Sequence, residues 1–356
     1  MHPTLKELLK TTVEKGASDL HINAGLPPQI RLDGTLVPAC DGILNSDDAK
    51  KICYECLNQE QVMRLDAERS IDLSFHLEDV SRFRANIYWA MDSTCGAFRT
   101  IPFSIPAPED IGVPENIVTL AKKPRGLILV TGQTGSGKST TLASLIERIN
   151  ITRNEHIITI EDPIEYVFTQ KKSLINQREV GRDTLSFTRA LKFILRQDPD
   201  IVLIGEMRDL ETIQSAITVA ETGHLVFATL HTNSAVQTID RIIDVFPPHH
   251  QAQVRTQLSF ILEGVICQQL IPKIGGGRAL ALEIMIPTSG IRNLIREGKT
   301  HQIAAQMQMG QQSTGMVMMD QFLVDMVRRN VIEMDEARKR AMNPEDFEHI
   351  VKHFSK

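Results

Sequence analysis

The sequence predicts an α/β fold built from two domains. Two observations lead to this prediction. Strand-like runs alternate with amphipathic segments over the first hundred residues, and from residue 115 apolar strands alternate regularly with helices. The length agrees, because 356 residues correspond to roughly two domains of about 150 residues. Apolar residues make up 42% and charged residues 23%, which is typical of a globular protein and excludes a disordered one.

Residues 1–100 predict a small α/β domain. Apolar residues at helical spacing predict an amphipathic helix over 4–15, and a second helix is expected over 47–68. Asp33-Gly34 favours a two-residue hairpin turn. Alternation of apolar and polar residues predicts strands at 19–23, 29–37, 70–77, 82–91 and 95–101. This order predicts a mostly antiparallel sheet with helices on one face.

A proline-rich stretch separates this domain from the rest of the chain. Residues 101–114 read IPFSIPAPEDIGVP, with prolines at 102, 106, 108 and 114. Each proline fixes its own φ and restricts the residue before it, so the stretch predicts an extended linker. We therefore expect one domain over residues 1–100, a linker over 101–114 and a second domain over 115–356.

Residues 115–356 predict a parallel α/β domain followed by a helical tail. The expected strands are 126–131, 156–161, 201–205, 225–230 and 280–286, and the expected helices are 138–150, 184–196, 209–221, 234–245 and 250–270. Strand and helix alternating at this spacing predict a parallel sheet covered on both faces. In the tail, residues 289–356, helices are expected at 289–297, 300–308, 317–329 and 334–341.

Composition also limits the partners and the compartment. The formal net charge is −5, and it is concentrated in the first 110 residues, so charge does not favour a nucleic-acid partner. Five cysteines, an odd number, are typical of free thiols. No apolar run approaches the ~18 residues of a spanning helix, and the N-terminus MHPTLKELLK does not resemble a signal peptide. We therefore expect a cytoplasmic protein, with peripheral membrane attachment left open.

The segment 126–140, GLILVTGQTGSGKST, matches G-x-x-x-x-G-K-[ST] between an apolar strand and a helix. Glycines allow backbone N–H groups to turn toward phosphate, and Lys138 supplies a cation to the β- and γ-oxygens. Ser139 offers a hydroxyl to Mg²⁺. A glycine-rich turn with a chance lysine is the alternative, and the agreement of all parts argues against it. The predicted ATP-binding residues here are Gly132, Gln133, Thr134, Gly135, Ser136, Gly137, Lys138, Ser139 and Thr140.

Carboxylates follow two other expected strands. Glu206 comes after the apolar run 201–204, where it can hold Mg²⁺ through water or orient the attacking water. Glu161 ends the run 156–161. We predict that Lys138, Glu161 and Glu206 are catalytic and that Ser139 and Glu206 are the Mg²⁺ ligands, partly through water. Solvated carboxylates at strand ends are the simpler alternative, and the sequence does not divide the roles between Glu161 and Glu206.

Two histidines flank the expected strand 225–230. His224 precedes this strand and His231 follows it, although a lone histidine is often only structural. In an open parallel sheet, ligands bind at the carboxyl ends of the strands. Because Gly132, Glu161 and Glu206 also lie at such ends, we expect them to face one site together with His231.

These motifs together resemble the secretion ATPase superfamily of type II secretion and type IV pili. The resemblance rests on GQTGSGKS, TIEDPIE, IVLIGEMRD and GHLVFATLHTNSA, and on ASDLHI, RLDG and SRFRAN in the first domain. SGIRNLIREGK, residues 289–299, is similar to the AIRNLIRE motif of PilT-type retraction ATPases, with Gly290 in place of alanine. The resemblance covers essentially the whole chain.

The resemblance implies a PAS-like N-terminal domain, a RecA-like ATPase domain and a ring-shaped homohexamer that binds ATP and Mg²⁺ between its domains. It implies that Arg82 and Arg84 approach the nucleotide. Residues two apart on a strand point to the same face, which agrees with a shared role, and a solvated strand face is the alternative. It also implies that Thr222 and His231 lie near the subunit boundary. With these, His224 completes the predicted nucleotide-binding set.

The resemblance favours retraction over extension of a pilus. Extension ATPases carry a four-cysteine zinc site, whereas here Cys53-x-x-Cys56 has no second CxxC, so four cysteine ligands cannot be assembled locally. The function implied is a hexameric ATPase that powers type IV pilus retraction and twitching motility. Its implied partner is an inner-membrane platform protein of the PilC type, which places the protein peripherally at the inner membrane.

Three alternatives remain open from the sequence. An accessory, PilU-like retraction paralogue would share both domains, and such an accessory ATPase could equally be a partner. A RecA-like nucleic-acid translocase is disfavoured by the acidic first domain. A scaffold that binds nucleotide without hydrolysis is disfavoured by the intact Lys138, Ser139 and Glu206.

Overall fold

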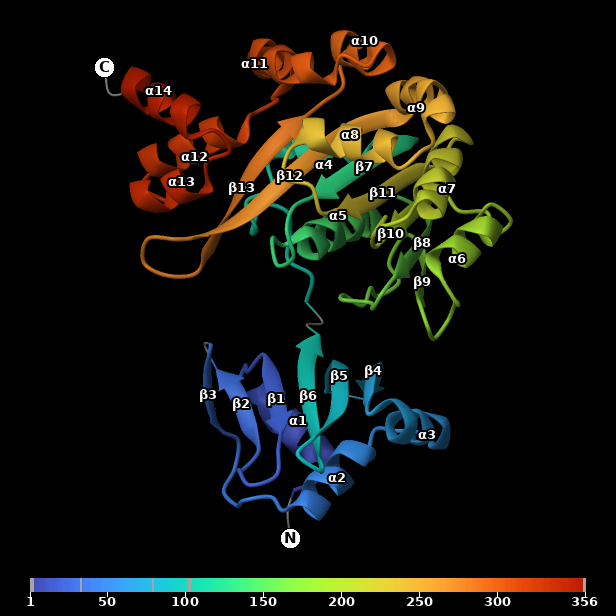
Figure 1. Ribbon diagram of the computed structural model, residues 1–356, viewed down its shortest axis with the longest axis vertical. Helices are drawn as coiled ribbons and strands as arrows, with labels where there is room; N and C mark the ends of the chain where they lie inside the picture. Colours follow the sequence, from blue (N-terminus) through green and yellow to red (C-terminus); the bar gives the residue numbers. More distant parts are fainter. Residues whose placement is uncertain (1–2, 33, 79, 102–103, 355–356) are drawn as a thin grey trace. The chain divides into compact units, whose positions relative to one another are not determined.

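The computed structural model describes residues 3–32, 34–78, 80–101 and 104–354, and it confirms the α/β class. The chain divides into two compact units (Figure 1). The first unit comprises residues 1–104 with 165–167, and the second comprises 105–164 with 168–356. Asp33 of the predicted hairpin turn and Pro102 of the predicted linker lie outside the described residues.

The first unit is a six-stranded antiparallel sheet in the order β3-β2-β1-β6-β5-β4. Its strands are β1 (Asp19–Ile22), β2 (Gln29–Leu32), β3 (Thr35–Pro38), β4 (Ser70–Leu77), β5 (Ser81–Ala90) and β6 (Ser93–Ile101), and its helices are α1 (Leu5–Glu14), α2 (Ser46–Tyr54) and α3 (Gln59–Glu68). The single helix predicted over 47–68 is wrong. Two helices, α2 and α3, form there instead. The second one starts after Asn58, which caps it by accepting the N–H of Gln61 with its side chain.

All three helices of the first unit pack on one face of its sheet, as predicted. Leu8 of α1, Cys53 of α2 and Leu65 of α3 share one core with Phe83 and Ile87 of β5. β5 alternates buried and more exposed residues along its length, because neighbouring side chains in a strand point to opposite faces. The other face of the sheet is therefore left to polar side chains.

The second unit is built on a seven-stranded sheet in the order β13-β12-β7-β11-β10-β8-β9, in which only β13 runs antiparallel to its neighbour. Its strands are β7 (Gly126–Thr131), β8 (His156–Glu161), β9 (Leu174–Glu179), β10 (Ile201–Ile204), β11 (Leu225–Leu230), β12 (Leu262–Pro272) and β13 (Arg278–Met285). The helices before and between them are α4 (Glu115–Leu120), α5 (Lys138–Thr152), α6 (Phe187–Ile194), α7 (Leu210–Glu221), α8 (Ala235–Asp244) and α9 (Pro248–Ile261).

The central strands of this sheet are buried on both faces. Leu127 and Leu129 of β7 belong to one core with apolar residues of α6, α7, α8 and α9. Ile128 and Val130, which point to the opposite face, are equally buried, and α5 packs on β7 while α4 packs on β12. This double cover explains why the sequence of these strands is continuously apolar.

The predicted helix over 250–270 is wrong in its second half. α9 ends at Ile261, and β12 runs from Leu262 to Pro272 beside β7. The residues Gly264, Val265 and Ile266 favour a strand over a helix. β9 and α4 were not predicted, and β13 is antiparallel although a parallel sheet was expected.

The tail is helical, as predicted, and it has one helix more than the four expected among its described residues. It comprises α10 (Ser289–Glu297), the 3₁₀ turn η1 (Thr300–Gln302), α11 (Ile303–Thr314), α12 (Met319–Arg328), α13 (Met334–Arg340) and α14 (Pro344–Phe354). Leu323 of α12 and Phe347 of α14 pack with Ile271 of β12 in a separate core. No helix in the described part of the chain combines the length and apolar character needed to cross a membrane.

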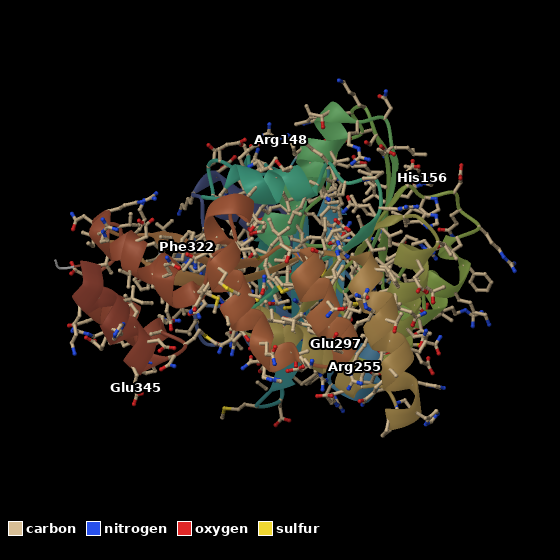
Figure 2. All side chains as sticks on the ribbon, turned by 90° about the horizontal axis from the view of Figure 1, so that it is seen from above. Arg148, His156, Arg255, Glu297, Phe322 and Glu345 are labelled. Atoms are coloured by element: carbon tan, nitrogen blue, oxygen red, sulfur yellow. The ribbon has the colours of Figure 1, made fainter. Side chains whose placement is uncertain are left out.

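α10 is held against the end of α9 by Arg292. This guanidinium donates to the carbonyl oxygen of Ser259 at 2.8 Å and to Glu263 at 2.9 Å, and Glu263 also pairs with Lys123 at 2.9 Å. Last-turn carbonyls of a helix lack partners within the helix, and Arg292 supplies one. Figure 2 shows Glu297 at the end of α10 near Arg255 of α9.

Glu283 of β13 joins two helices from inside the core. Its side chain is buried, and its carboxylate accepts the N–H of Ala235 at 2.7 Å and the N–H of Met319 at 3.4 Å. These are the first residues of α8 and α12. Burial raises the pKa of Glu283, and the negative charge of Asp320 adds to this, while the two N–H donors oppose it.

Candidate functional site

The phosphate loop joins β7 to α5, and glycines give it its shape. Gly132, which leaves the strand, has φ +141°, and a Cβ there would lie 2.4 Å from the carbonyl oxygen of Gln268. Gly135 and Gly137 have φ of +79° and +88°. Glycine adopts these conformations at little cost, so the loop can turn its N–H groups toward an anion at the N-terminus of α5.

Lys138 is the first residue of α5 and is only 9% exposed. Its ammonium donates to the carbonyl oxygens of Gly132 at 2.8 Å and Gln133 at 3.1 Å, both at the start of the same loop. A cation is thereby held over the loop, where phosphate oxygens can compete for it. Ser139 follows in the first turn of α5, half-buried. The predicted loop residues 132–140 therefore lie together, and their individual roles stay predictions.

Glu206 and His231 meet, although they follow different strands. β10 and β11 are parallel neighbours, and His231 Nε2 lies 2.7 Å from Glu206 Oε1. Arg208 Nε lies 2.7 Å from the same oxygen. Burial alone would raise the pKa of Glu206, but the hydrogen bond from Arg208 and the charge of His231 outweigh it, so this pKa lies below its usual range. Glu206 therefore remains a carboxylate at neutral pH.

Glu161 lies at the end of β8, the other parallel neighbour of β10. Thr159 Oγ1 donates to Glu161 Oε1 at 2.7 Å, and Gln177 Nε2 donates to the same oxygen at 3.3 Å. Gly205 lets the two strand ends approach, because a Cβ there would lie 3.2 Å from the Glu161 Cα. Glu161 and Glu206 thus lie at neighbouring ends of one sheet edge, as the sequence predicts.

The residues predicted to hold Mg²⁺ offer suitable ligands. A hydroxyl from Ser139 and a carboxylate from Glu206 are hard oxygen donors, which Mg²⁺ prefers. No three or more His, Cys, Asp or Glu side chains of the described residues form a group that could hold a metal by themselves. Mg²⁺ usually binds through few protein ligands, with water and substrate phosphates completing its shell. This donor set fits a nucleotide-borne Mg²⁺ better than a resident metal.

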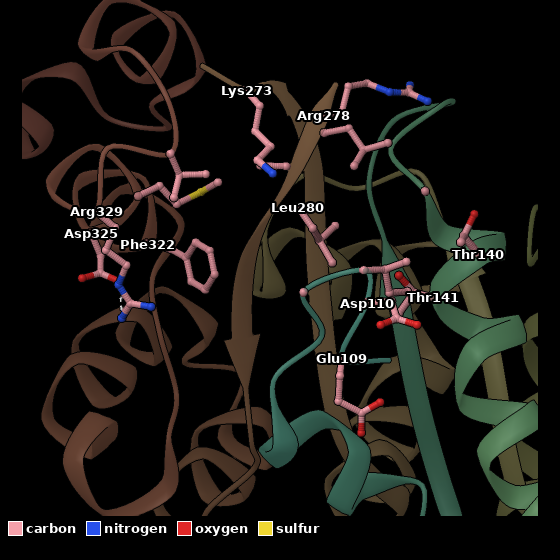
Figure 3. A pocket seen from close by; sticks show the side chains of 17 residues that line it. Glu109, Asp110, Thr140, Thr141, Lys273, Arg278, Leu280, Phe322, Asp325 and Arg329 are labelled. Atoms are coloured by element: carbon pink, nitrogen blue, oxygen red, sulfur yellow. Dashed lines mark ion pairs between the residues drawn. The ribbon is translucent and has the colours of Figure 1, made fainter. Parts of the chain in front are cut away.

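A pocket of about 660 Å³ adjoins the phosphate loop (Figure 3). One wall is the start of α5 with Gly137 and Thr140, and another is the hairpin of β12 and β13. Phe322 of α12 presents an aromatic ring to the pocket from the tail. The volume lies within the ~300–1,000 Å³ typical of small-molecule sites. The pocket can therefore hold the remainder of a ligand whose phosphates bind at the loop.

Comparison with known proteins decides the family. A family model described as type II/IV secretion system protein matches residues 113–276. A Pseudomonas aeruginosa (strain PAO1) protein named type IV pilus retraction ATPase PilT is 50% identical over 96% of this chain and 99% of its own length. The chain belongs to the type II/IV secretion system protein family.

Two further relatives refine its position among these secretion proteins. The crystal structure titled as the pilus retraction motor PilT with bound ADP has a TM-score of 0.93 and 48% identity, covering 98% of this chain and 100% of that one. The type IV pilus ATPase PilU of P. aeruginosa (strain PAO1) is 36% identical over 98% of this chain and 91% of its own length. The chain is therefore more similar to PilT than to PilU.

In this secretion-family chain, Thr222 and His224 lie away from the phosphate loop. The N–H of Gly126, the first residue of β7, donates to the His224 carbonyl oxygen at 3.0 Å, whereas the loop follows the last residue of β7. At ~3.3 Å per residue, about 20 Å of strand separates the two places. Thr222 Oγ1 lies 3.1 Å from His224 Nδ1. Within one chain these two residues therefore lie away from the loop, and their predicted role in nucleotide binding stays a prediction.

Arg82 and Arg84 share the polar face of the first unit's sheet. Both lie on β5, with the fully buried Phe83 between them on the core side. Arg82 donates to Ser74 Oγ at 2.8 Å, and Arg84 is exposed. Their common face agrees with the spacing argument, and their approach to nucleotide stays a prediction.

Sequence reasoning missed Gln268, which contacts the phosphate loop directly. It lies on β12, inside the segment expected to be helical, and donates from Nε2 to the carbonyl oxygen of Ser136 at 2.7 Å. No local motif marks it. Only the pairing of β12 with β7 places it beside the loop.

Proposed function

We propose that this chain is a Mg²⁺-dependent ATPase subunit of a homohexamer that powers retraction of a type IV pilus. The observation that carries the proposal is the meeting of Glu206 and His231 at the sheet edge that holds the phosphate loop, in a chain 50% identical to a retraction ATPase over nearly its whole length. Loop, cation and carboxylate are the parts that phosphoryl transfer to water requires.

Phosphate binding, Mg²⁺ binding and orientation of the attacking water fall to different side chains. Lys138 binds the β- and γ-phosphates in exchange for its present carbonyl partners. Ser139, and Glu206 through water, hold Mg²⁺, which neutralises developing charge when bound. Glu206 is fixed by Arg208 and His231 and is ionised, which suits it to orient the attacking water. The base and sugar lie in the pocket beside α5, where Lys273 and Arg278 add positive charge.

Steady-state turnover of the purified protein tests the proposal, together with its mass in solution. Wild type should hydrolyse ATP as a species of about six protomers. Lys138→Ala should lose nucleotide binding, while Glu206→Gln should bind ATP but lose most turnover, because the amide cannot replace the carboxylate. Comparing the turnover of Glu161→Gln with that of Glu206→Gln shows on which of the two carboxylates hydrolysis depends more strongly. Unchanged turnover in Glu206→Gln would sink the assignment.

The direction of work and the partner need cellular tests. A retraction motor predicts that deleting this gene alone abolishes pilus retraction, whereas an accessory, PilU-like role predicts retraction with reduced force. The higher identity to PilT than to PilU supports the first. We further propose docking of the ring on an inner-membrane platform protein of the PilC type. Crosslinking that captures no platform protein in piliated cells would contradict this partner.

A further inference from the structure

Gln268 lies beneath the phosphate loop and is 1% exposed. In the pairing of β12 with β7, its neighbour Cys267 lies opposite Thr131, the last residue before the loop begins. Gln268 is therefore the first residue of β12 beyond the end of β7. At this position its side chain lies beside the loop that leaves β7.

Gln268 and its strand contact the beginning and the end of the loop. Its carbonyl oxygen lies 2.4 Å from where a Cβ of Gly132 would be, so only glycine fits there. Its Nε2 donates to the carbonyl oxygen of Ser136 at 2.7 Å. The same nitrogen lies 3.3 Å from where a Cβ of Gly137 would be, and Leu270 lies 3.4 Å from that point. β12 thus forms the floor of the loop.

The bond to Ser136 has a direct bearing on anion binding. A phosphate loop binds its ligand through N–H groups that point inward, so the carbonyls of the same peptides point outward and need partners in the protein. The Ser136 carbonyl belongs to the peptide whose N–H is that of Gly137. A donor that fixes this carbonyl fixes the direction of that N–H as well.

The side-chain oxygen of Gln268 indicates that this amide is present for its contact with the loop and not for packing in the core. Its Oε1 is buried without a hydrogen-bond partner among the described residues, and so is the nearby Ser136 Oγ. A buried polar atom without a partner destabilises the fold, and an apolar side chain of similar size would avoid this cost. Proteins accept such costs mainly at functional sites.

We propose that Gln268 is a positioning residue for nucleotide binding, which holds the phosphate loop in its anion-binding shape through the Ser136 carbonyl. The proposal rests on the proposed ATPase function. Gln268 does not touch the nucleotide. It sets affinity for the phosphates and leaves the hydrolytic step to the strand-end carboxylates.

The test compares Gln268→Met with Gln269→Met in the full-length protein. Gln269 is the next residue of β12, points to the opposite face and is half-buried, so it controls for the substitution itself. The measurements are the Kd for MgADP by calorimetry, KM and kcat for ATP, and the melting temperature. Gln268→Met should raise Kd and KM by ~3- to 10-fold, with kcat within about twofold. Gln269→Met should match wild type.

Gln268→Glu adds a second arm. It removes the donor and places a carboxylate near the phosphates, so Kd should rise further than in Gln268→Met. Wild-type ADP affinity in both Gln268 variants overturns the inference while leaving the ATPase proposal intact. A parallel fall of kcat and melting temperature without a change in Kd also overturns it, since that is the signature of a merely structural residue. Failure of wild type to bind MgADP overturns both proposals.

Discussion

His231 Nε2 lies 2.7 Å from Glu206 Oε1, so the residues that follow β11 and β10 are joined by one short contact. Arg208 reaches the same oxygen from two residues further along the chain. Glu206 is thereby held between two donors at the edge where the phosphate loop begins. The contact makes the orientation of this carboxylate depend on the loop after β11.

Replacing His231 with alanine should lower kcat more than it changes KM. The phosphate loop is untouched, so ATP still binds, but Glu206 loses one of the two donors that orient it. Misplacing a catalytic group can cost up to ~100-fold, and we expect a fall in kcat of roughly 10- to 100-fold. Steady-state kinetics check this, with the exposed His250→Ala of α9 as the control. An unchanged kcat would mean that the contact has no catalytic role.

Replacing Arg208 with alanine should shift the acid limb of kcat to higher pH. In the wild type, the donors outweigh burial and keep the pKa of Glu206 below its usual value of 4.5, so the carboxylate persists as pH falls. Burial raises the pKa of Glu206, and without Arg208 this effect is opposed less strongly. The pKa therefore rises, and Glu206 is protonated at higher pH. Profiles of kcat from pH 4 to 8 measure the shift. A superimposable acid limb in the two proteins would contradict the electrostatic account.

Gly132→Ala should be more damaging than Gly135→Ala. Both positions have positive φ, which an alanine adopts at a cost of ~1–2 kcal/mol. Only at Gly132 would the new methyl also collide, with the Gln268 carbonyl oxygen at 2.4 Å, whereas nothing lies within 4 Å at Gly135. Thermal unfolding should show a drop of roughly 2–8 °C for Gly135→Ala and a clearly larger one for Gly132→Ala. Equal effects would refute the close approach.

Glu283→Gln should remove a pH dependence of stability. Because the pKa of Glu283 is raised in the folded protein, the folded state binds this proton more tightly than the unfolded state. The associated stability is fully present below the unfolded value of about 4.5 and is lost as pH rises through the folded pKa. Urea unfolding of both proteins at pH 5 and pH 8 should therefore give a larger decrease for wild type than for Glu283→Gln. Parallel decreases would show that Glu283 does not titrate in this way.

Arg292→Ala should destabilise the second unit, and Arg296→Ala should not. Arg292 donates to the Ser259 carbonyl and to Glu263, and it is largely buried. Losing charge-assisted bonds of this kind costs about 2–3 kcal/mol. Arg296 lies on the exposed side of α10, where substitutions stay within ~0.5 kcal/mol. Denaturant unfolding of the two variants separates these cases, and similar midpoints would argue against the anchoring role.

Much of the candidate site could be predicted because its signals are local. The phosphate loop is a continuous motif, and a strand-end carboxylate such as Glu206 is recognised from the apolar run that precedes it. Parallel strands place their carboxyl ends on one edge, so the meeting of Glu206 and His231 follows from strand order. Periodicity also predicted the antiparallel sheet of the first unit.

The remaining features depend on pairings distant in sequence. β12 follows α9 without a break, so its residues read as more helix until β7 pairs with them. Gln268 is placed at the loop by that pairing alone. Thr222 and His224 lie at the opposite end of the sheet from the phosphate loop, so their predicted role in nucleotide binding depends on an arrangement of subunits that one chain does not contain.

The carboxylate of Glu283 is one acceptor shared by two helices of separate origin. α8 begins four residues after His231. α12 belongs to the separate core that the C-terminal helices form with Ile271 of β12. A displacement of the start of α8 would change its hydrogen bond to the carboxylate that also accepts from the start of α12. The first turns of α8 and α12 therefore share one buried carboxylate as a common hydrogen-bond acceptor.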